Sequence, residues 1–329
     1  MHASDVDAAL ENWGNRVFNS GPVKKRIRRG MTGLRLLAPL ATHTGAGSGR
    51  MDASAVRRKI GALAKRPPQV MVRISGGGKG IRHIKAHLDY ISRNGQIPLE
   101  DQNGDRLIGK DDIAALRDEW QLGGFAIEEK ATNRQAFNII LSMPAGTSDL
   151  AVLRAARDFA SSEFQNYQYA MALHTPDTDP DDDPSPNPHV HLCVKATSLD
   201  GTRLNPRKAD LQRWREAFAH HLREHGVECE ATKRIHRLQP ARGEKQSVRH
   251  KKARGEALDR IGMAPPDLQR AERARNAESE IQARYRALAS ALAGSERAED
   301  RRLGGELATH GLGGSPGMSS RGRDGSRDR

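Results

Sequence analysis

Four segments of the chain alternate between apolar and polar residues, which predicts β-strands because successive strand side chains point to opposite faces. In the last of them, Val190, Leu192 and Val194 alternate with polar residues and with histidine. The third segment shows the same period and ends on a histidine. The predicted strands span residues 70–75, 137–143, 167–174 and 189–195.

Other segments carry apolar residues at every third or fourth position, as on the buried face of a helix. The clearest case holds Ile81, Ile84, Leu88 and Ile91 in one stripe. Because helices alternate with strands and the last two strands are expected to form a hairpin, the pattern predicts an α+β domain. Its core is a central, mainly antiparallel sheet with helices packed on it. The predicted helices span residues 81–92, 111–120, 149–163, 205–225 and 267–292.

Composition divides the chain into three parts. We predict a basic, disordered extension over residues 1–66, a globular domain over 67–237, and a charged helical and then disordered tail over 238–329. The extension holds a basic run at residues 24–29 and a glycine-rich linker at 45–50. A hydrophobic content of 36% and an aromatic content of 4% are too low for all 329 residues to pack into cores, which favours this division.

The charge balance points to a polyanionic partner. Lysine and arginine number 54 against 41 acidic residues, a formal charge of +13, and nucleic acid is the usual partner of such a protein. The two cysteines, Cys193 and Cys229, make no framework of pairs, so we expect a reducing cytoplasm. We find no signal peptide, and the apolar run at residues 34–40 is too short for membrane insertion.

Three histidines gather at the predicted hairpin. His189 and His191 lie two residues apart and share one face of a strand, and His174 ends the strand before it. If these strands pair antiparallel, the three imidazoles converge and form a divalent-metal site with positions open for substrate. Two carboxylates, Asp177 and Asp179, lie in the intervening loop.

The tyrosine best placed for chemistry is Tyr90. It projects away from the apolar stripe of its helix and precedes Arg93-Asn-Gly95, which is typical of a helix stop. Tyr167 and Tyr169 lie in a strand with apolar partners, where packing is their expected role.

A glycine-rich loop, Gly76-Gly-Gly-Lys-Gly80, follows the first predicted strand. It lacks the Gly-Lys-Ser/Thr spacing of a nucleotide-binding P-loop, so we predict no ATP site there. Its amides are candidates for contact with a DNA phosphate. The same role is open to four basic side chains: Arg73, Lys79, Arg82 and Arg93.

Two motifs carry a family resemblance: Leu88-Asp-Tyr-Ile-Ser-Arg-Asn-Gly95, and His174 with Asp177 before His189-Val-His191. On these motifs residues 70–233 resemble the conjugative relaxases, mobilisation endonucleases of the HUH superfamily, and most closely the T-DNA border endonuclease type. The family usually has its acid two residues after the first histidine. Here Asp177 stands in the third place, so the supporting acid is open between Asp177 and Asp179.

The resemblance implies an HUH endonuclease-like fold and a set of roles. Tyr90 is then the nucleophile that attacks single-stranded DNA at a transfer origin, and His174, His189 and His191 ligate Mg²⁺ or Mn²⁺. The product is a 5′-phosphotyrosine that pilots the strand in conjugative transfer. The implied partners are an accessory origin-binding protein and a type IV coupling protein, and the protein is expected in the cytoplasm and, attached to DNA, in the recipient cell.

Other functions fit part of the pattern. A rolling-circle replication initiator uses similar chemistry, but its tyrosine normally follows the histidines, where only Tyr285 is found. A non-catalytic DNA-binding protein would use the histidines for a structural metal. A metallohydrolase would use a metal-bound water and leave no covalent protein–DNA product.

Overall fold

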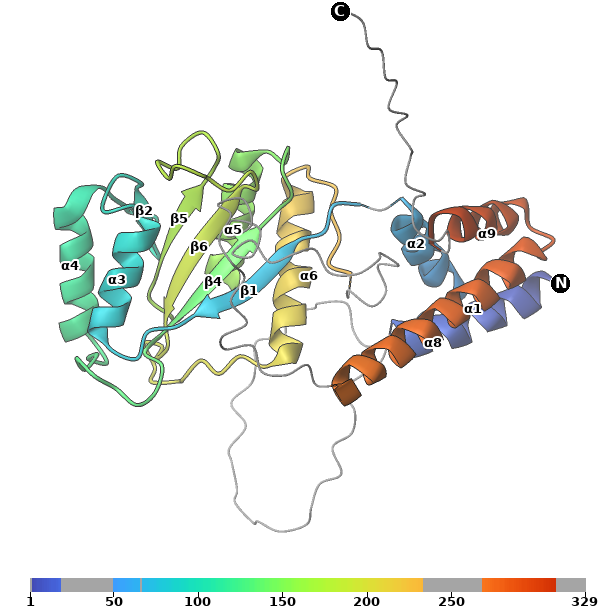
Figure 1. The fold of residues 1–329 in the computed structure, drawn as a ribbon, viewed down its shortest axis with the longest axis horizontal. Helices are drawn as coiled ribbons and strands as arrows, with labels where there is room; N and C mark the ends of the chain where they lie inside the picture. Colours follow the sequence, from blue (N-terminus) through green and yellow to red (C-terminus); the bar gives the residue numbers. More distant parts are fainter. Residues whose placement is uncertain (1, 19–49, 66, 233–267, 312–329) are drawn as a thin grey trace, which may run out of the picture. The chain divides into compact units, whose positions relative to one another are not determined.

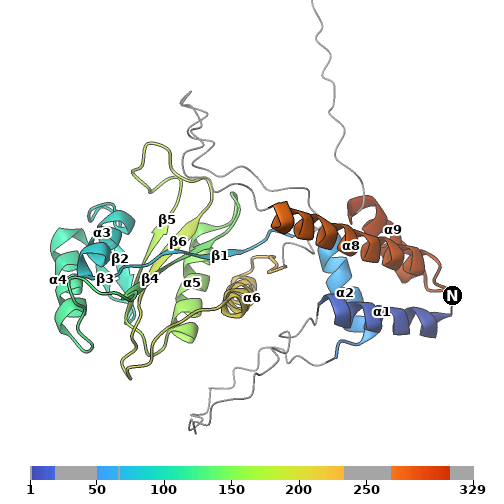
Figure 2. The ribbon, with the colours of Figure 1, turned by 60° about the horizontal axis from the view of Figure 1, so that its bottom comes forward.

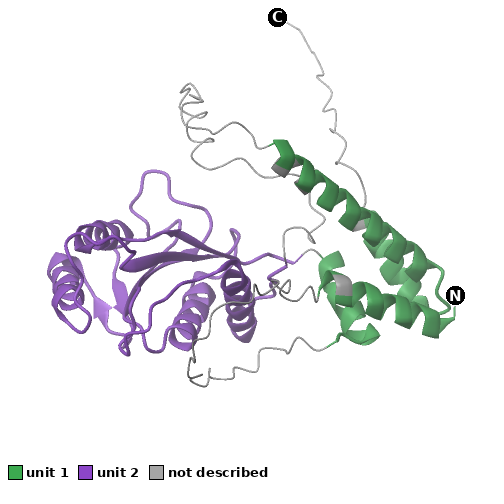
Figure 3. Ribbon diagram, turned by 90° about the horizontal axis from the view of Figure 1, so that it is seen from below, with its two compact units in different colours: residues 1–66, 234–329 green, residues 67–233 purple. Residues whose placement is uncertain are grey.

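A computed structural model of the protein describes residues 2–18, 50–65, 67–232 and 268–311. The chain separates into two compact units (Figure 3). Residues 67–233 form one unit, and residues 1–66 together with 234–329 form the other. The predicted basic run at 24–29, most of the linker at 45–50 and the tail beyond 311 lie outside the described residues.

The unit of residues 67–233 is a six-stranded sheet in which every neighbouring pair is antiparallel. The strand order is β1-β4-β6-β5-β2-β3. The predicted α+β class with a mainly antiparallel sheet is therefore confirmed. The strands are β1 (Met71–Gly76), β2 (Leu99–Asp101), β3 (Arg106–Leu107), β4 (Ala136–Ser142), β5 (Tyr169–His174) and β6 (His189–Lys195).

Two helices cover each face of the sheet (Figure 1 and Figure 2). Helices α5 (Asp149–Glu163) and α6 (Lys208–Glu224) pack on the face that holds Val190, Leu192 and Val194. Helices α3 (Ile81–Ile91) and α4 (Gly109–Leu122) pack on the other face. The strands contribute the small side chains of Ala170, Ala172 and Cys193 to this second core. The alternation of β6 thus sends its apolar residues into one core and its histidines to the side of α3.

Strands β2 and β3 are absent from the sequence prediction, which has only the helix of residues 111–120 in this region. Both are too short to show an alternating pattern. Strand β2 joins the sheet by pairing with β5, where Glu100 lies opposite Met171 and Asp101 opposite Ala170, and β3 pairs with β2. A partner 71 positions away therefore decides the conformation of β2.

The glycine-rich loop after β1 has a packing role. A Cβ atom at Gly80 would lie 2.1 Å from the carbonyl oxygen of Glu129, and one at Gly77 would lie 2.4 Å from that of Ala136. The amide of Ile81 donates to the carbonyl oxygen of Glu128. Glycine is required here because the backbone of residues 128–136 approaches the loop closely.

The second unit differs from the expectation of a disordered extension at residues 3–17 and 53–64, which are helical, whereas residues 19–49 lie outside the described part of the chain. Helices α1 (Ala3–Val17) and α2 (Ala53–Ala64) pack with α8 (Leu268–Ala293) and α9 (Ala298–Gly311) around a shared apolar core. Arg57 on α2 donates to both carboxylate oxygens of Asp300. The helical spacing of Val6, Leu10 and Val17 was the available sequence signal. None of the described helices is long and apolar enough to cross a membrane.

The turn after α3 requires a glycine, and its replacement is the first test of the fold. Gly95 has φ of +89°, and a Cβ there would lie 2.8 Å from the carbonyl carbon of Gly109. Gly104 has a similar φ of +85° with no atom within 4 Å of a Cβ, so Gly104→Ala is the matched control. We expect Gly104→Ala to lower the free energy of unfolding by about 1–2 kcal/mol through backbone strain.

Gly95→Ala should cost more than the control, because the close contact adds to the strain. Urea denaturation of both variants measures the difference. Equal losses for the two variants would show that the contact with Gly109 relaxes freely, contrary to this expectation.

Candidate active site

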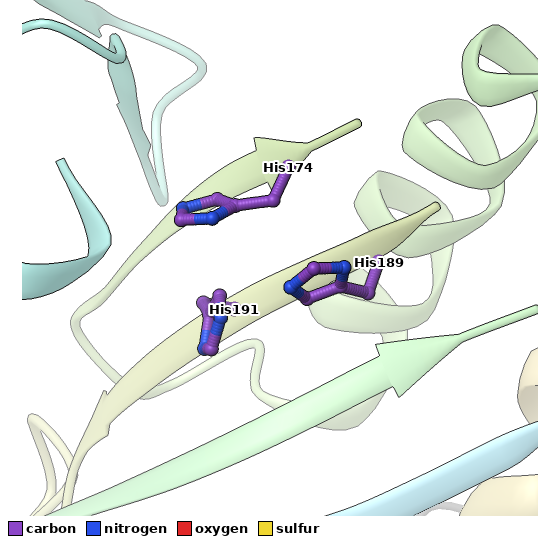
Figure 4. A group of neighbouring side chains, drawn as sticks. All are labelled: His174, His189 and His191. Atoms are coloured by element: carbon purple, nitrogen blue, oxygen red, sulfur yellow. The ribbon is translucent and has the colours of Figure 1, made fainter. Parts of the chain in front are cut away.

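The three predicted histidines converge where β5 and β6 pair (Figure 4). His174 lies opposite His189, and Ala172 lies opposite His191, so the expected antiparallel pairing is confirmed. The ring centroids are 5.2 Å apart for His174 and His189 and 4.7 Å apart for His174 and His191. One ligand nitrogen from each residue lies within 4.8 Å of the others. This spacing suits a single ion held between the three rings.

Hydrogen bonds orient two of these rings. The Nδ1 atom of His189 lies 2.9 Å from the carbonyl oxygen of Asn187, and since that oxygen only accepts, Nδ1 donates. The Nδ1 atom of His174 lies 2.9 Å from Oδ2 of Asp179, and its Nε2 atom lies 2.7 Å from the carbonyl oxygen of Ile91. The Nδ1 atom of His191 is buried with no hydrogen-bond partner among the described residues. A donating Nδ1 leaves Nε2 of His189 as a lone-pair donor for a metal.

The electrostatics keep two of the rings neutral. Burial lowers the pKa of His191 to about 2, and burial also lowers the pKa of His189. Neutral imidazole is the form that binds metals. The three imidazoles fit a divalent transition-metal ion that would replace the contact between Nε2 of His174 and the Ile91 carbonyl oxygen. Of the two predicted ions, Mn²⁺ fits better than Mg²⁺, which prefers oxygen ligands.

Tyr90 lies beside this cluster. Its side chain is 52% exposed, and its ring is perpendicular to that of His191 with centroids 5.7 Å apart. The guanidinium carbon of Arg93 lies 4.8 Å from the centre of the Tyr90 ring. The structure thus brings the tyrosine of one predicted motif next to the histidines of the other.

The two predicted carboxylates have different surroundings. Asp179 is buried and accepts from Nε and Nη2 of Arg93 at 2.7 and 2.8 Å, in addition to its contact with His174. The hydrogen bonds from Arg93 hold the pKa of this carboxyl well below its usual range, although burial opposes them. Asp177 is exposed, and burial, together with the nearby charge of Asp177, raises the pKa of Asp149. Arg93, expected as a phosphate contact, is therefore bound to carboxylate.

One further residue of the site escaped the sequence prediction. His87 is stacked on Tyr90 with centroids 6.3 Å apart, and the same distance separates it from His191. Burial lowers the pKa of His87 to about 4, and its Nε2 atom has no hydrogen-bond partner among the described residues. The available signal was its place three residues before Tyr90, on the same side of a helix.

The comparison with family models agrees with the class of protein that the sequence suggested. Residues 95–227 match the family described as Relaxase: MobA/VirD2-like, nuclease domain. This segment contains the three histidines and Asp179, and it begins after Tyr90. The predicted resemblance to relaxases is therefore confirmed over residues 95–227.

Particular relatives point the same way. The chain is 32% identical over 121 residues to the T-DNA border endonuclease VirD2 of Agrobacterium fabrum, a match that covers 32% of this chain and 27% of that protein. VirD2 of Rhizobium rhizogenes is also 32% identical over 121 residues, with 32% and 28% covered. The chain thus spans less than a third of the length of the curated relatives it matches.

A solved structure described as "Molecular Basis of Vancomycin Resistance Transfer in Staphylococcus aureus" has a TM-score of 0.31 and 13% identity. The alignment covers 51% of this chain and 99% of that chain. Nothing about the fold or the function follows from a likeness at this level.

Proposed function

We propose that this protein is a site- and strand-specific DNA nicking and joining enzyme, a relaxase, that acts by tyrosine transesterification. The observation that carries the proposal is an exposed tyrosine, Tyr90, whose ring lies 5.7 Å from that of His191 in a cluster of three histidines. The match to a relaxase nuclease domain and the formal charge of +13 support DNA as the substrate.

The proposed step exchanges one phosphoester for another. The hydroxyl oxygen of Tyr90 forms a bond to the phosphorus of a single-stranded DNA phosphodiester, and the bond from phosphorus to the 3′-oxygen breaks. The products are a 5′-phosphotyrosine and a free 3′-hydroxyl, and the proton lost by the phenol is balanced by the one gained by the 3′-oxygen. Because no water is consumed, the reverse reaction rejoins the strand.

Each residue near the tyrosine has a proposed task. His174, His189 and His191 hold a divalent cation, which when bound polarises the scissile phosphate and offsets its developing charge. Asp179 accepts a hydrogen bond from Nδ1–H of His174 and thereby fixes the tautomer of that ring. We assign this support to Asp179 and not to Asp177, because Asp179 lies 2.9 Å from His174 whereas Asp177 is exposed.

The wider role rests on the relatives, which are named as T-DNA border endonucleases. By that likeness we propose that the protein nicks a transfer origin and stays on the 5′ end of the strand in conjugative transfer. It would act in the cytoplasm and then enter the recipient cell with the DNA. An accessory origin-binding protein and a type IV coupling protein are the proposed partners.

The surroundings of Tyr285 disfavour a rolling-circle initiator. This tyrosine, which follows the histidines in the chain, is fully buried in the core shared by α1, α2, α8 and α9. Burial raises its pKa, which opposes the deprotonation that a nucleophile needs. Tyr90 therefore remains the proposed nucleophile.

The proposal is tested with single-stranded oligonucleotides tiled across the DNA that flanks the gene. Purified protein is incubated with each oligonucleotide and Mn²⁺ or Mg²⁺, and the products are run on a denaturing gel. We expect a slowly migrating covalent adduct that requires metal. Cleavage without an adduct would favour a metallohydrolase, and binding without cleavage across an extended tiling would favour a non-catalytic DNA-binding protein.

A further inference from the structure

Arg93 follows Ser92, the cap of helix α3, and its backbone has an unusual conformation. Its φ is +49°, and Asn94 and Gly95 follow with φ of +57° and +89°. Arginine seldom adopts this left-handed region, and such strain persists where the surroundings hold it in place, often at functional sites. The turn brings the guanidinium carbon to 4.8 Å from the centre of the Tyr90 ring, three residues earlier.

The guanidinium also reaches the histidine cluster. Its Nε and Nη2 atoms donate to the two carboxylate oxygens of Asp179, at 2.7 and 2.8 Å, and Nη2 lies 3.1 Å from Asp181. Asp179 in turn contacts Nδ1 of His174, and Nε2 of His174 lies 2.7 Å from the carbonyl oxygen of Ile91. Because Nε2 is the atom with which His174 would ligate a metal, an ion would replace its contact with Ile91. The remaining contacts form a circuit that runs from Tyr90 through Arg93 and Asp179 to His174.

The circuit uses properties that are specific to arginine. A planar guanidinium donates two parallel hydrogen bonds to one carboxylate and stacks over an aromatic ring, whereas a lysine ammonium supplies only a point charge. Both carboxylate oxygens of Asp179 are engaged in this way, and the side chain of Arg93 is only 17% exposed. Little of the guanidinium is left free to contact a DNA phosphate directly.

We propose that Arg93 is a positioning residue that couples the nucleophile to the metal centre. Through Asp179 it holds the ring of His174, and through its stacking it holds the ring of Tyr90, so that both halves of the site keep one relative geometry. This inference rests on the proposed function. Its alternative is that Arg93 is a direct contact for the scissile phosphate, a role that depends on charge and not on the two parallel hydrogen bonds.

The test compares five variants with the wild type. Arg93→Gln removes the charge and the two parallel hydrogen bonds, and Arg93→Lys keeps only the charge. Asp179→Asn removes the carboxylate, and a double variant combines Arg93→Gln with Asp179→Asn. The matched control is Arg157→Gln, which breaks another arginine–carboxylate pair, between Arg157 on α5 and Glu100 on β2. Three quantities are measured: the rate of adduct formation at saturating oligonucleotide, the oligonucleotide Kd by fluorescence anisotropy, and Mn²⁺ affinity by calorimetry without DNA.

For Arg93→Gln we expect adduct formation to slow by about 100-fold, the effect of a misplacement of about 1 Å, with an oligonucleotide Kd close to that of the wild type. Mn²⁺ affinity should fall by about tenfold or more, as when the partner of a metal-binding histidine is lost. Arg93→Lys should not restore the rate. The double variant should be no slower than the slower single variant, Arg93→Gln or Asp179→Asn, because both changes break one circuit. Arg157→Gln should match the wild type in the rate of adduct formation, in oligonucleotide Kd and in Mn²⁺ affinity.

Several results would overturn the inference. Rescue by Arg93→Lys, or a weaker oligonucleotide Kd with an unchanged rate at saturation, would make Arg93 a phosphate contact. If Arg93→Gln fails to fold, as judged by its melting curve, Arg93→Lys decides by the same criteria. Adduct formation at the wild-type rate in Arg93→Gln overturns this inference alone. The absence of any adduct in the wild type overturns the proposed function as well.

Discussion

Tyr90→Phe should abolish the covalent protein–DNA adduct and leave the fold and DNA binding intact. The substitution removes only the hydroxyl, and the ring keeps its contacts with His191 and Arg93. Because the side chain is 52% exposed, the free energy of unfolding should change by less than about 0.5 kcal/mol. Loss of a nucleophile removes nearly all activity, so we expect the rate of adduct formation to fall by more than about 10⁴-fold.

Denaturing gels with a cleavable oligonucleotide measure this rate, and fluorescence anisotropy measures binding. The matched control is Tyr285→Phe, which removes a buried hydroxyl that has no hydrogen-bond partner among the described residues. That change should leave nicking unaltered and keep or slightly raise the melting temperature. An adduct that survives in Tyr90→Phe and disappears in Tyr285→Phe would contradict the assignment and support the rolling-circle alternative.

Loss of His191 should abolish Mn²⁺ binding and metal-dependent nicking. His191 is buried, and its ring centroid lies 4.7 Å from that of His174, 5.0 Å from that of His189 and 5.7 Å from that of Tyr90. His191→Ala leaves two ligands of three, so Mn²⁺ affinity should fall by more than about 100-fold, beyond the cost of losing an outer hydrogen-bond partner. Calorimetry of the chelator-treated protein measures this affinity.

Chelation of the wild type should give the same loss of nicking, and added Mn²⁺ should restore nicking to the wild type but not to His191→Ala. His220→Ala is the control, because His220 is an exposed histidine on α6 that pairs with Glu224. Nicking by the chelated wild type at its full rate would show that the histidines serve another purpose. Tight Mn²⁺ binding by His191→Ala would place the metal elsewhere in the chain.

Local pattern was enough to predict the sheet's principal strands and the faces of its helices. A strand with a period of two sends His189 and His191 to one side and Val190 and Leu192 to the other, whatever the neighbours are. The stripe of Ile84 and Leu88 similarly determined which side of α3 is buried, and the departure of Tyr90 from that stripe agreed with its exposure. These features depend on residues within one turn or one strand.

The tertiary structure decided which groups surround the histidines. The choice of Asp179 over Asp177 as the contact of His174 depends on the path of the loop between β5 and β6, and two neighbouring carboxylates look alike in a sequence. Arg93 meets Asp179 across 86 positions, and Ile91 meets His174 across 83. Such contacts follow from the packing of α3 against the sheet.

The unit built from α1, α2, α8 and α9 shows the same contrast between local pattern and tertiary contacts. Amphipathic spacing in residues 3–17 indicates a helix, but a helix of this length is marginal in water without a partner. Its partners include α8, more than 250 positions away, and Arg57 on α2 pairs with Asp300 on α9. Except for β2 and β3, which depend on strand pairing, sequence by itself determined the local elements of the unit of residues 67–233. Only the tertiary structure decided their partners, because burial and hydrogen bonding between distant segments supply the free energy that selects them.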